Sequence, residues 1–357
     1  SNKPGVRRYL NGSHLRGGAQ PRALADSIIA YAVNIARLEN LGDDVQRIIH
    51  KHCALNVQST DYQIVHDNLM AAIAEVLGDA VTPEIGAAWS EAVMALGKLL
   101  IKAEGDLYQK AAAATGGWNG LRQFHIISKK VEADGIVSIS LRPVDGQPIM
   151  LHEPGQYLTV SVNPLGKQYF APRHYTITSR PGDEAYRVTV KALADGDHHG
   201  IVSTYVVEKL QVGDVVNLFP PFGPAALRGN PKKPAVFVSA GVGITPWATL
   251  IPAALNRGQK VILFHADSSS KTHALRHEIE SALGPGAAIN YSYSHPFDGD
   301  EKLQHFSKGR LDVSKIKHVL DNRGLHFSDV DFFLSMKPLS SVTLASQLKK
   351  EGALDSS

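Results

Sequence analysis

The sequence of 357 residues has almost no cysteine and little excess charge. Its single cysteine, Cys53, excludes an internal disulfide and a metal site built from cysteines, and it favours a reducing compartment, which we expect to be the cytoplasm. The net charge of +3, without a basic stripe or tail, indicates no nucleic-acid partner. The uncharged stretch between Lys233 and Arg257 has the length of a membrane span. Glycines and prolines interrupt it, so we expect no span.

The composition is otherwise ordinary. Hydrophobic residues make up 43% of the chain and charged residues 20%, as in many soluble globular proteins. The length allows two or three domains, each with a core of its own. The sequence begins at Ser1, without a methionine or the hydrophobic region of a signal peptide, so we expect it to be a fragment.

Apolar residues recur every three or four positions in the first third of the chain, which predicts helices. Such stripes begin near Gln20, Gly42 and Thr60, and a fourth follows the helix-start signal Thr82-Pro83-Glu84. The pattern ends at the glycine pair Gly116-Gly117. The sequence therefore predicts an all-α domain over residues 1–115.

Alternation of apolar and polar residues replaces the helical period after this glycine pair. Short strands with proline and glycine turns between them predict an antiparallel β-barrel over residues 116–231; they cover 123–128, 136–142, 156–162, 174–178, 186–190 and 215–218. From 232 to 357, strands at 235–239, 260–265, 289–294 and 331–334 alternate with helical stretches. That order predicts an α/β domain with an open parallel sheet.

The segment from Pro234 to Leu255 reads as a buried strand, a glycine turn and the start of a helix. Gly241, Val242 and Gly243 would let the backbone approach a ligand closely, and Ile244, Thr245 and Pro246 lead into the helix. Free amides at such a turn bind the pyrophosphate of a nicotinamide dinucleotide. The alternative is a plain strand-turn-helix without a ligand.

Three polar side chains occupy inward positions on the predicted helices. His52 follows a stripe of apolar residues, and Tyr62 and Glu104 hold equivalent places on the next helices. A buried glutamate needs a donor, and a histidine that binds haem iron needs an acceptor for its second N–H. The three fit the proximal side of a haem site. A histidine satisfied within an ordinary core is the alternative.

A second ligand pattern lies in the predicted barrel. Arg173 and Tyr175 share a face of one strand, so the guanidinium can pair with a phosphate while the ring lies against a flat group, and Thr176 points to the other face. Amides at the start of a helix at Gly200 would meet a phosphate, and Tyr157 supplies another ring. An ordinary arginine and tyrosine on a barrel strand are the alternative.

Together these motifs resemble the flavohaemoglobin family, in which a globin is fused to a flavin and nicotinamide reductase module. The resemblance runs from Asn11 to about Lys350, and the junction Gly116-Gly117-Trp118 matches as well. The matching site residues, in chain order, are Gln20 and Leu24 for the distal helix, Lys51, His52, Tyr62 and Glu104 for the proximal side, Gln156, Tyr157, Arg173, His174, Tyr175, Thr176, Gly200, Val202 and Ser203 for the flavin, and Gly241, Val242, Gly243, Ile244, Thr245 and Pro246 for the nicotinamide dinucleotide.

The resemblance implies a nitric oxide dioxygenase, an oxidoreductase that uses haem b, FAD and NAD(P)H to convert nitric oxide and O2 to nitrate. His52 would bind the haem iron, and Glu104 with Tyr62 would make its imidazole more anionic for catalysis. The family's distal tyrosine, which precedes the position of Ser1, and its C-terminal flavin-covering aromatic residue have no counterpart here. We therefore expect a chain truncated at both ends.

One internal segment also departs from the family pattern. Phe333-Leu334-Ser335-Met336-Lys337 stands where relatives have a Phe-Leu-Cys-Gly-Pro-like segment, which should weaken nicotinamide placement. Two other functions stay open: an FAD-dependent NAD(P)H reductase with an external acceptor, and a haem protein that only binds gas or is inactive. The sequence leaves oligomeric state and the choice between NADH and NADPH undecided.

Overall fold

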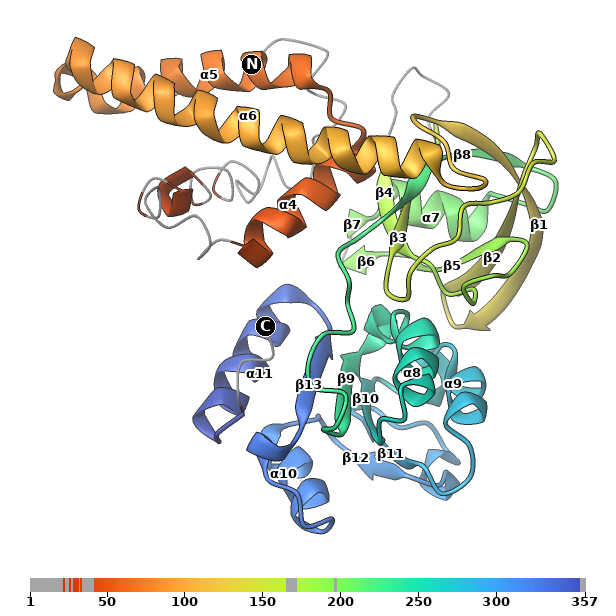
Figure 1. The fold of residues 1–357 in the computed structure, drawn as a ribbon. Coiled ribbons are helices and arrows are strands. Elements are labelled where there is room, and N and C mark those ends of the chain that lie inside the picture. The colour runs from red at the N-terminus through yellow and green to blue at the C-terminus, as the bar shows by residue number, and fades with distance from the viewer. Residues whose placement is uncertain are drawn as a thin grey trace. The chain divides into compact units, whose positions relative to one another are not determined.

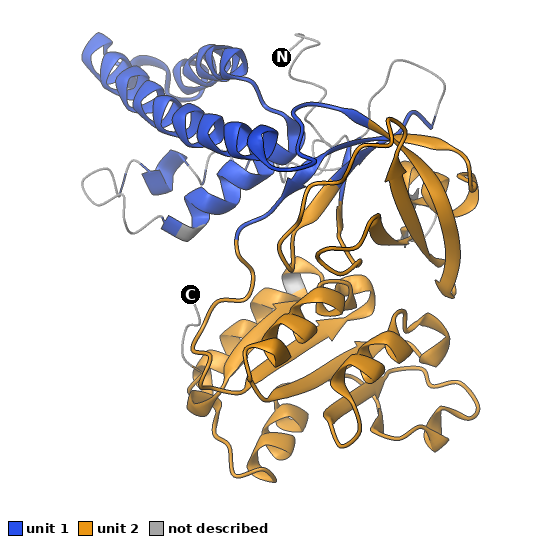
Figure 2. Cartoon of the chain, turned by 45° about the vertical axis from the view of Figure 1, so that its right-hand side comes forward, with its two compact units in different colours: residues 1–122, 159–174, 217–224 blue, residues 123–158, 175–216, 225–357 orange. Residues whose placement is uncertain are grey.

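A computed structural model describes residues 42–164, 172–195 and 198–353, together with positions 22, 26, 28–31 and 33. The chain divides into two compact units (Figure 2). The first unit holds residues 1–122, 159–174 and 217–224, and the second holds 123–158, 175–216 and 225–357. The domain limits at 115 and 231 stay predictions. Among the described residues, we find no helix that is both long enough and apolar enough to cross a membrane.

Three helices dominate the N-terminal region: α4 (Gly42–Leu55), α5 (Ser59–Leu77) and α6 (Pro83–Ala113) (Figure 1). Thr82 caps α6, because its hydroxyl accepts a hydrogen bond from the amide of Ile85 at 3.3 Å. Leu100 and Glu104 of α6 are both buried, so the inward position predicted for Glu104 is confirmed. The helix ends at Ala113, just before the glycine pair.

The strands that follow form one six-stranded sheet in the order β4-β3-β8-β1-β2-β5. Their bounds are β1 Arg122–Ala133, β2 Ile136–Pro143, β3 Tyr157–Ser161, β4 Arg173–Thr176, β5 Tyr186–Lys191 and β8 Val215–Phe222. An antiparallel bridge joins Ile177, just after β4, to Val188 of β5. Because β4 and β5 are the two edges of the sheet, this bridge closes it, as the barrel prediction requires. The short strands β6 (Ala194–Asp195) and β7 (His198–His199) lead into α7 (Ile201–Glu208).

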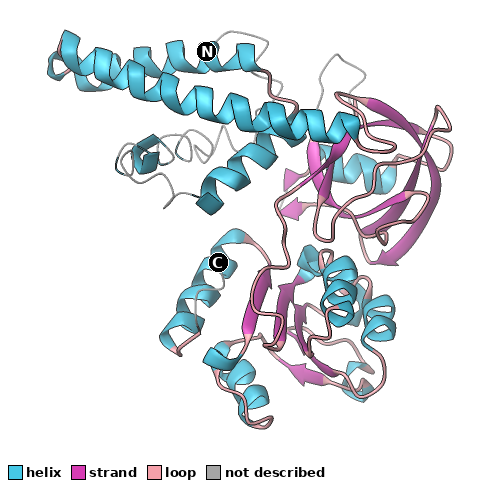
Figure 3. Ribbon diagram, viewed as in Figure 1, coloured by secondary structure: helices cyan, strands magenta, loops and turns pink. Residues whose placement is uncertain are grey.

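The C-terminal region is an open parallel sheet in the order β12-β11-β10-β9-β13, as predicted (Figure 3). The strands are β9 Ala235–Ala240, β10 Val261–Asp267, β11 Ala288–Tyr293, β12 Phe306–Lys308 and β13 Asp331–Ser335. Neither β12 nor the helix α10 (Val313–Asp321) that follows it was predicted from the sequence pattern. With three residues, β12 is too short to show an alternating period.

Alternating residues of this sheet build two cores. Phe237 and Leu263 pack on the side of α8 (Trp247–Asn256) and α9 (Arg276–Leu283), whereas Val238 packs on the side of α10 and α11 (Pro338–Lys350). Burial on both faces explains why the strands read as continuous apolar runs.

The connections of this sheet create a switch point. The chain runs outward from β9 through β10 and β11 to β12, and then returns as β13 on the other side of β9. In open α/β sheets, ligands bind outside the carboxyl ends of the strands where the order reverses. The carboxyl ends of β9 and β13 are therefore the expected binding edge.

Candidate functional site

His52, Tyr62 and Glu104 meet, although each comes from a different helix. Glu104 of α6 accepts two hydrogen bonds on Oε1, from Nδ1 of His52 in α4 at 2.8 Å and from the hydroxyl of Tyr62 in α5 at 2.5 Å. The tyrosine oxygen also lies 3.0 Å from Nδ1 of His52. A carboxylate only accepts, so the proton of a neutral His52 sits on Nδ1 and its Nε2 presents a lone pair.

Burial fixes the role of Tyr62 in this triad. Glu104 is 2% exposed, and burial together with the charge of Glu104 raises the pKa of Tyr62, so the phenol remains a donor. By contrast, the side chain of His52 is 34% exposed. Among the described residues, nothing donates to or accepts from its Nε2. A lone pair on the second ring nitrogen is what a metal ligand requires, so the three residues fit a haem iron.

The surroundings of α4 hold this histidine in place. Tyr108 of α6 donates to the carbonyl of Val57 at 2.9 Å, just beyond the helix end, and Nδ1 of His50 accepts from the amide of Gly223 at 3.1 Å. Cys53 is buried, and burial followed by the charge of Glu104 raises the pKa of its thiol to about 12. The thiol is therefore inert packing. Lys51 is exposed, and Gln20 and Leu24 lie outside the described residues.

The residues of the flavin motif occupy the strands that were predicted for them. Arg173, His174, Tyr175 and Thr176 make up β4. Nδ1 of His174 lies 2.8 Å from the hydroxyl of Thr159 on β3. Gln156 precedes β3 and its carbonyl accepts from the amide of Ile177 at 2.9 Å, which holds Tyr157 at the start of that strand.

The second flavin segment forms a tight helix start. Gly200 caps α7, and a methyl group there would approach the Cβ of Leu193 to 2.8 Å. The hydroxyl of Ser203 accepts from the amide of Leu193 at 3.1 Å, while Val202 packs inward at 2% exposure. Only glycine fits this turn, as a close backbone approach requires.

The glycine loop lies at the switch point. Gly241–Ile244 forms a 3₁₀ turn directly after β9, and Gly241 has a φ of +55°. A methyl group on Gly243 would overlap the carbonyl oxygen of Ser335 at the end of β13. The hydroxyl of Thr245 donates to the carbonyl of Val242 at 3.1 Å. Pro246 directly precedes α8.

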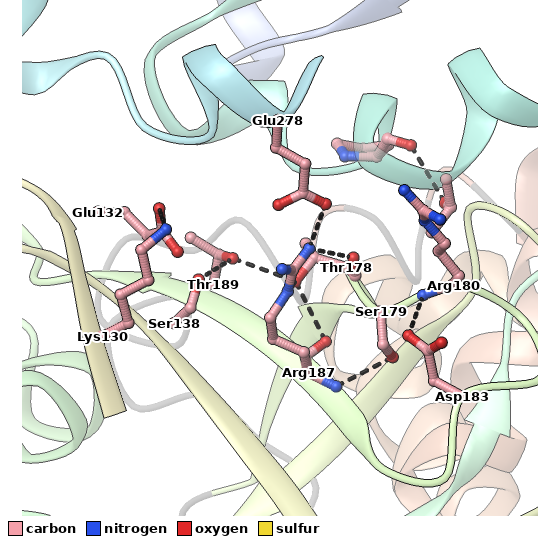
Figure 4. A network of polar contacts seen from close by, with 12 residues as sticks. Lys130, Glu132, Ser138, Thr178, Ser179, Arg180, Asp183, Arg187, Thr189 and Glu278 are labelled. Carbon is pink, nitrogen blue, oxygen red and sulfur yellow. Dashed lines mark hydrogen bonds and ion pairs between the residues drawn. The ribbon is translucent and has the colours of Figure 1, made fainter. Parts of the chain in front are cut away.

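A polar network that the sequence analysis missed links β5 to α9 within the second unit (Figure 4). Arg187 donates from Nη2 to Oε1 of Glu278 at 2.6 Å and from Nε to the hydroxyl of Thr178 at 3.1 Å. Its amide donates to the hydroxyl of Ser179 at 3.0 Å. Residues of the barrel thus orient the guanidinium of Arg187, which pairs with the carboxylate of Glu278 in the nucleotide-binding domain.

Known proteins carry the same architecture. The chain is 37% identical to a flavohaemoprotein of Pseudomonas aeruginosa over 339 residues, which cover 94% of this chain and 83% of the relative. A flavohaemoprotein of Halalkalibacterium halodurans is 36% identical over 334 residues, 92% of this chain and 81% of that relative. No protein-family model matches the chain.

Two solved structures resemble the fold of this chain. The flavohaemoglobin of Malassezia yamatoensis, solved with bound FAD and haem, superposes with a TM-score of 0.82 at 25% identity, covering 97% of this chain and 86% of that one. The FAD/NAD-binding domain of a nitric oxide dioxygenase from Vibrio cholerae gives a TM-score of 0.57 at 27% identity, covering 66% of this chain and 94% of that one. The chain belongs to the flavohaemoprotein family.

Proposed function

We propose that this protein is a nitric oxide dioxygenase, an oxidoreductase that converts nitric oxide and O2 to nitrate with NAD(P)H as electron donor. The observation that carries the proposal is the hydrogen bond from Nδ1 of His52 to Glu104 at 2.8 Å, which leaves Nε2 free for iron. The electrons balance: one NAD(P)H supplies two electrons, and two nitric oxide molecules with two O2 take them up as two nitrates.

The haem side of the reaction depends on three residues of this chain. His52 would hold the iron through Nε2, and the carboxylate of Glu104 would keep the imidazole electron-rich by accepting its Nδ1 proton. Tyr62 would fix that carboxylate in place through its 2.5 Å hydrogen bond. An electron-rich axial ligand favours oxygen activation over simple binding. When bound, haem b supplies the metal centre for O2, and FAD supplies the step from two-electron to one-electron transfer.

The reductase side follows the motifs of the barrel and the parallel sheet. Arg173 would pair with an FAD phosphate, Tyr175 would lie against the flavin, and the amides that follow Gly200 would meet phosphate oxygens. The loop at Gly241–Pro246 would bind the pyrophosphate of NAD(P)H at the switch point. The corresponding domains are 1–115 for haem, 116–231 for FAD and 232–357 for NAD(P)H, in a protein that we place in the cytoplasm.

Absorbance spectra of protein purified with haem supplied test this function. We expect a Soret band and flavin bands that both change when NADH is added, and NAD(P)H oxidation that nitric oxide accelerates in air. Flavin bands without a Soret band would instead support a reductase with an external acceptor, and a Soret band that NADH leaves unchanged would support a gas-binding protein.

Two variants test the site assignments separately. His52→Ala should lose haem and keep FAD, since it removes only the residue that would bind the iron, whereas Arg173→Ala should lose FAD and keep haem. Stoichiometric haem in the first variant would refute the ligand assignment. Normal FAD content in the second would refute the role of Arg173.

A further inference from the structure

The loop after β10 lies beside the glycine loop. Ala240 of β9 pairs with Ala266 of β10, so Gly241 and Asp267 follow at neighbouring strand ends. In dinucleotide-binding sheets, the residue at the end of this second strand contacts the adenosine ribose. An acidic residue binds the 2′-hydroxyl of NAD, and a basic residue nearby accommodates the 2′-phosphate of NADP.

Asp267 has the position of such an acid but is turned into its own loop. Its Oδ1 accepts from the amide of Ser268 at 2.7 Å and from the hydroxyl of Thr272 at 2.5 Å. Its Oδ2 lies 3.5 Å from Nε2 of His265, and the side chain is 4% exposed. Because the carboxylate is buried, it is not accessible to the hydroxyls of a ribose.

The groups that this loop exposes are suited to an anion instead. Ser268 and Lys271 are both exposed. The ammonium of Lys271 lies 3.6 Å from the ring centroid of Phe297, and it has no carboxylate within ion-pair distance among the residues that the structure describes. Hydrogen bonds also tie the loop to its neighbour, since buried Asp300 accepts from the amides of Ser270 at 3.1 Å and Phe297 at 2.9 Å.

We propose that the loop Ser268–Lys271 binds the 2′-phosphate of NADPH, with Lys271 as the specificity-determining residue, so that the protein prefers NADPH to NADH. This inference rests on the proposed use of NAD(P)H. Because Asp267 is buried in its own loop, its carboxylate is not presented to a phosphate at the surface, and a cation held against an aromatic ring is positioned before the ligand arrives.

The adenosine half of the cofactor tests this without any redox chemistry. Calorimetry on the full chain should show adenosine 2′,5′-bisphosphate binding about tenfold or more tightly than AMP, which corresponds to about 1.4 kcal/mol for one well-placed ion pair. Lys271→Gln should remove most of that ratio, and Lys271→Arg should retain it. Lys260→Gln serves as the matched control, because Lys260 is exposed directly before β10, at the opposite end of the strand; it should leave the ratio unchanged.

Flavin reduction provides a second readout. Stopped-flow rates at low cofactor concentration should favour NADPH in the unmodified protein and lose that preference in Lys271→Gln, with little change for NADH. Equal binding of the two nucleotides, or a ratio that Lys271→Gln leaves unchanged, would overturn the inference. Neither result would affect the haem spectra or the nitric oxide reaction, so the inference and the proposed function fail separately.

Discussion

The imidazole rings of His265 and His273 lie with their centroids 4.0 Å apart and their planes tilted by 32°, both buried in the nucleotide-binding domain. Nδ1 of His265 bonds the hydroxyl of Ser239 at 2.9 Å, and Nδ1 of His273 bonds the hydroxyl of Tyr293 at 2.8 Å. Burial lowers the pKa of both rings, and the charge of His265 lowers that of His273 further. Both histidines are therefore neutral in the native protein at neutral pH.

Acid should destabilise this domain through the histidine pair. Below about pH 6.5, the ordinary histidine pKa, the two imidazoles bind protons in the unfolded chain but not in the folded one. The free energy of unfolding therefore falls as the pH falls. Each ring can contribute up to about 1.4 kcal/mol per pH unit in that window. Thermal unfolding of His273→Gln between about pH 7 and pH 5 should show a shallower loss than the unmodified protein. An unchanged slope would contradict this assignment.

The sequence could predict the meeting of His52, Tyr62 and Glu104 but not the pairing of His265 with His273, for a physical reason. Helical spacing alone turns His52, Tyr62 and Glu104 inward, so their meeting follows from packing three regular helices. His273 reaches His265 only because the 3₁₀ turn Ser270–Thr272 redirects the chain after β10, and no periodicity encodes such a turn. The parallel sheet was predicted because its apolar runs are continuous.

The ion pair Arg187–Glu278 is another contact that sequence periodicity does not predict, here between residues far apart in the chain. Its partners lie 91 positions apart in the chain, and neither residue stands out in the sequence, since charged residues on a strand and on the first turn of a helix are usually solvated. The contact arises only when the barrel and the nucleotide-binding fold pack together within the second unit. Fold class is therefore readable from local patterns, while polar links between folds depend on the tertiary arrangement.

Weakening the acceptor for His52 should impair turnover more than haem binding. Glu104→Gln replaces a carboxylate with a neutral amide, so the imidazole loses its charged acceptor but keeps its place. We expect near-stoichiometric haem, a lower iron–histidine stretching frequency by resonance Raman spectroscopy, and a turnover about 10- to 100-fold lower. Tyr62→Phe should have a smaller effect in the same direction, because the carboxylate remains.

Glu91→Gln is the matched control for this experiment, since Glu91 is an exposed acid on the same helix. It should leave the spectrum and the turnover unchanged. A normal stretching frequency and full turnover in Glu104→Gln would show that the carboxylate does not tune the imidazole.

The ion pair Arg187–Glu278 should contribute modestly to stability. The two side chains are 24% and 32% exposed, so solvent weakens their attraction, and we expect a coupling energy of about 1 kcal/mol. Urea unfolding of Arg187→Gln, Glu278→Gln and the double variant measures it. The coupling should shrink as salt is raised to about 1 M, because mobile ions screen partly exposed charges. Coupling that is independent of salt would contradict an electrostatic origin.

The two glycines of the dinucleotide loop should respond differently to alanine, because different constraints act on them. At Gly241 a methyl group meets nothing within 4 Å, but the φ of +55° is unfavourable for alanine, so Gly241→Ala should cost about 1–2 kcal/mol. At Gly243 the methyl group would overlap the carbonyl of Ser335, so the backbone itself must move.

Gly243→Ala should therefore separate the ends of β9 and β13 at the switch point, with a loss of about 1–3 kcal/mol from overpacking and a much weaker affinity for NAD(P)H. Gly241→Ala should keep most of that affinity, because its cost is conformational and the strand ends stay together. Unfolding midpoints and AMP titrations of both variants distinguish the two effects. Equal losses of nucleotide affinity would show that loop conformation, rather than contact with Ser335, shapes this site.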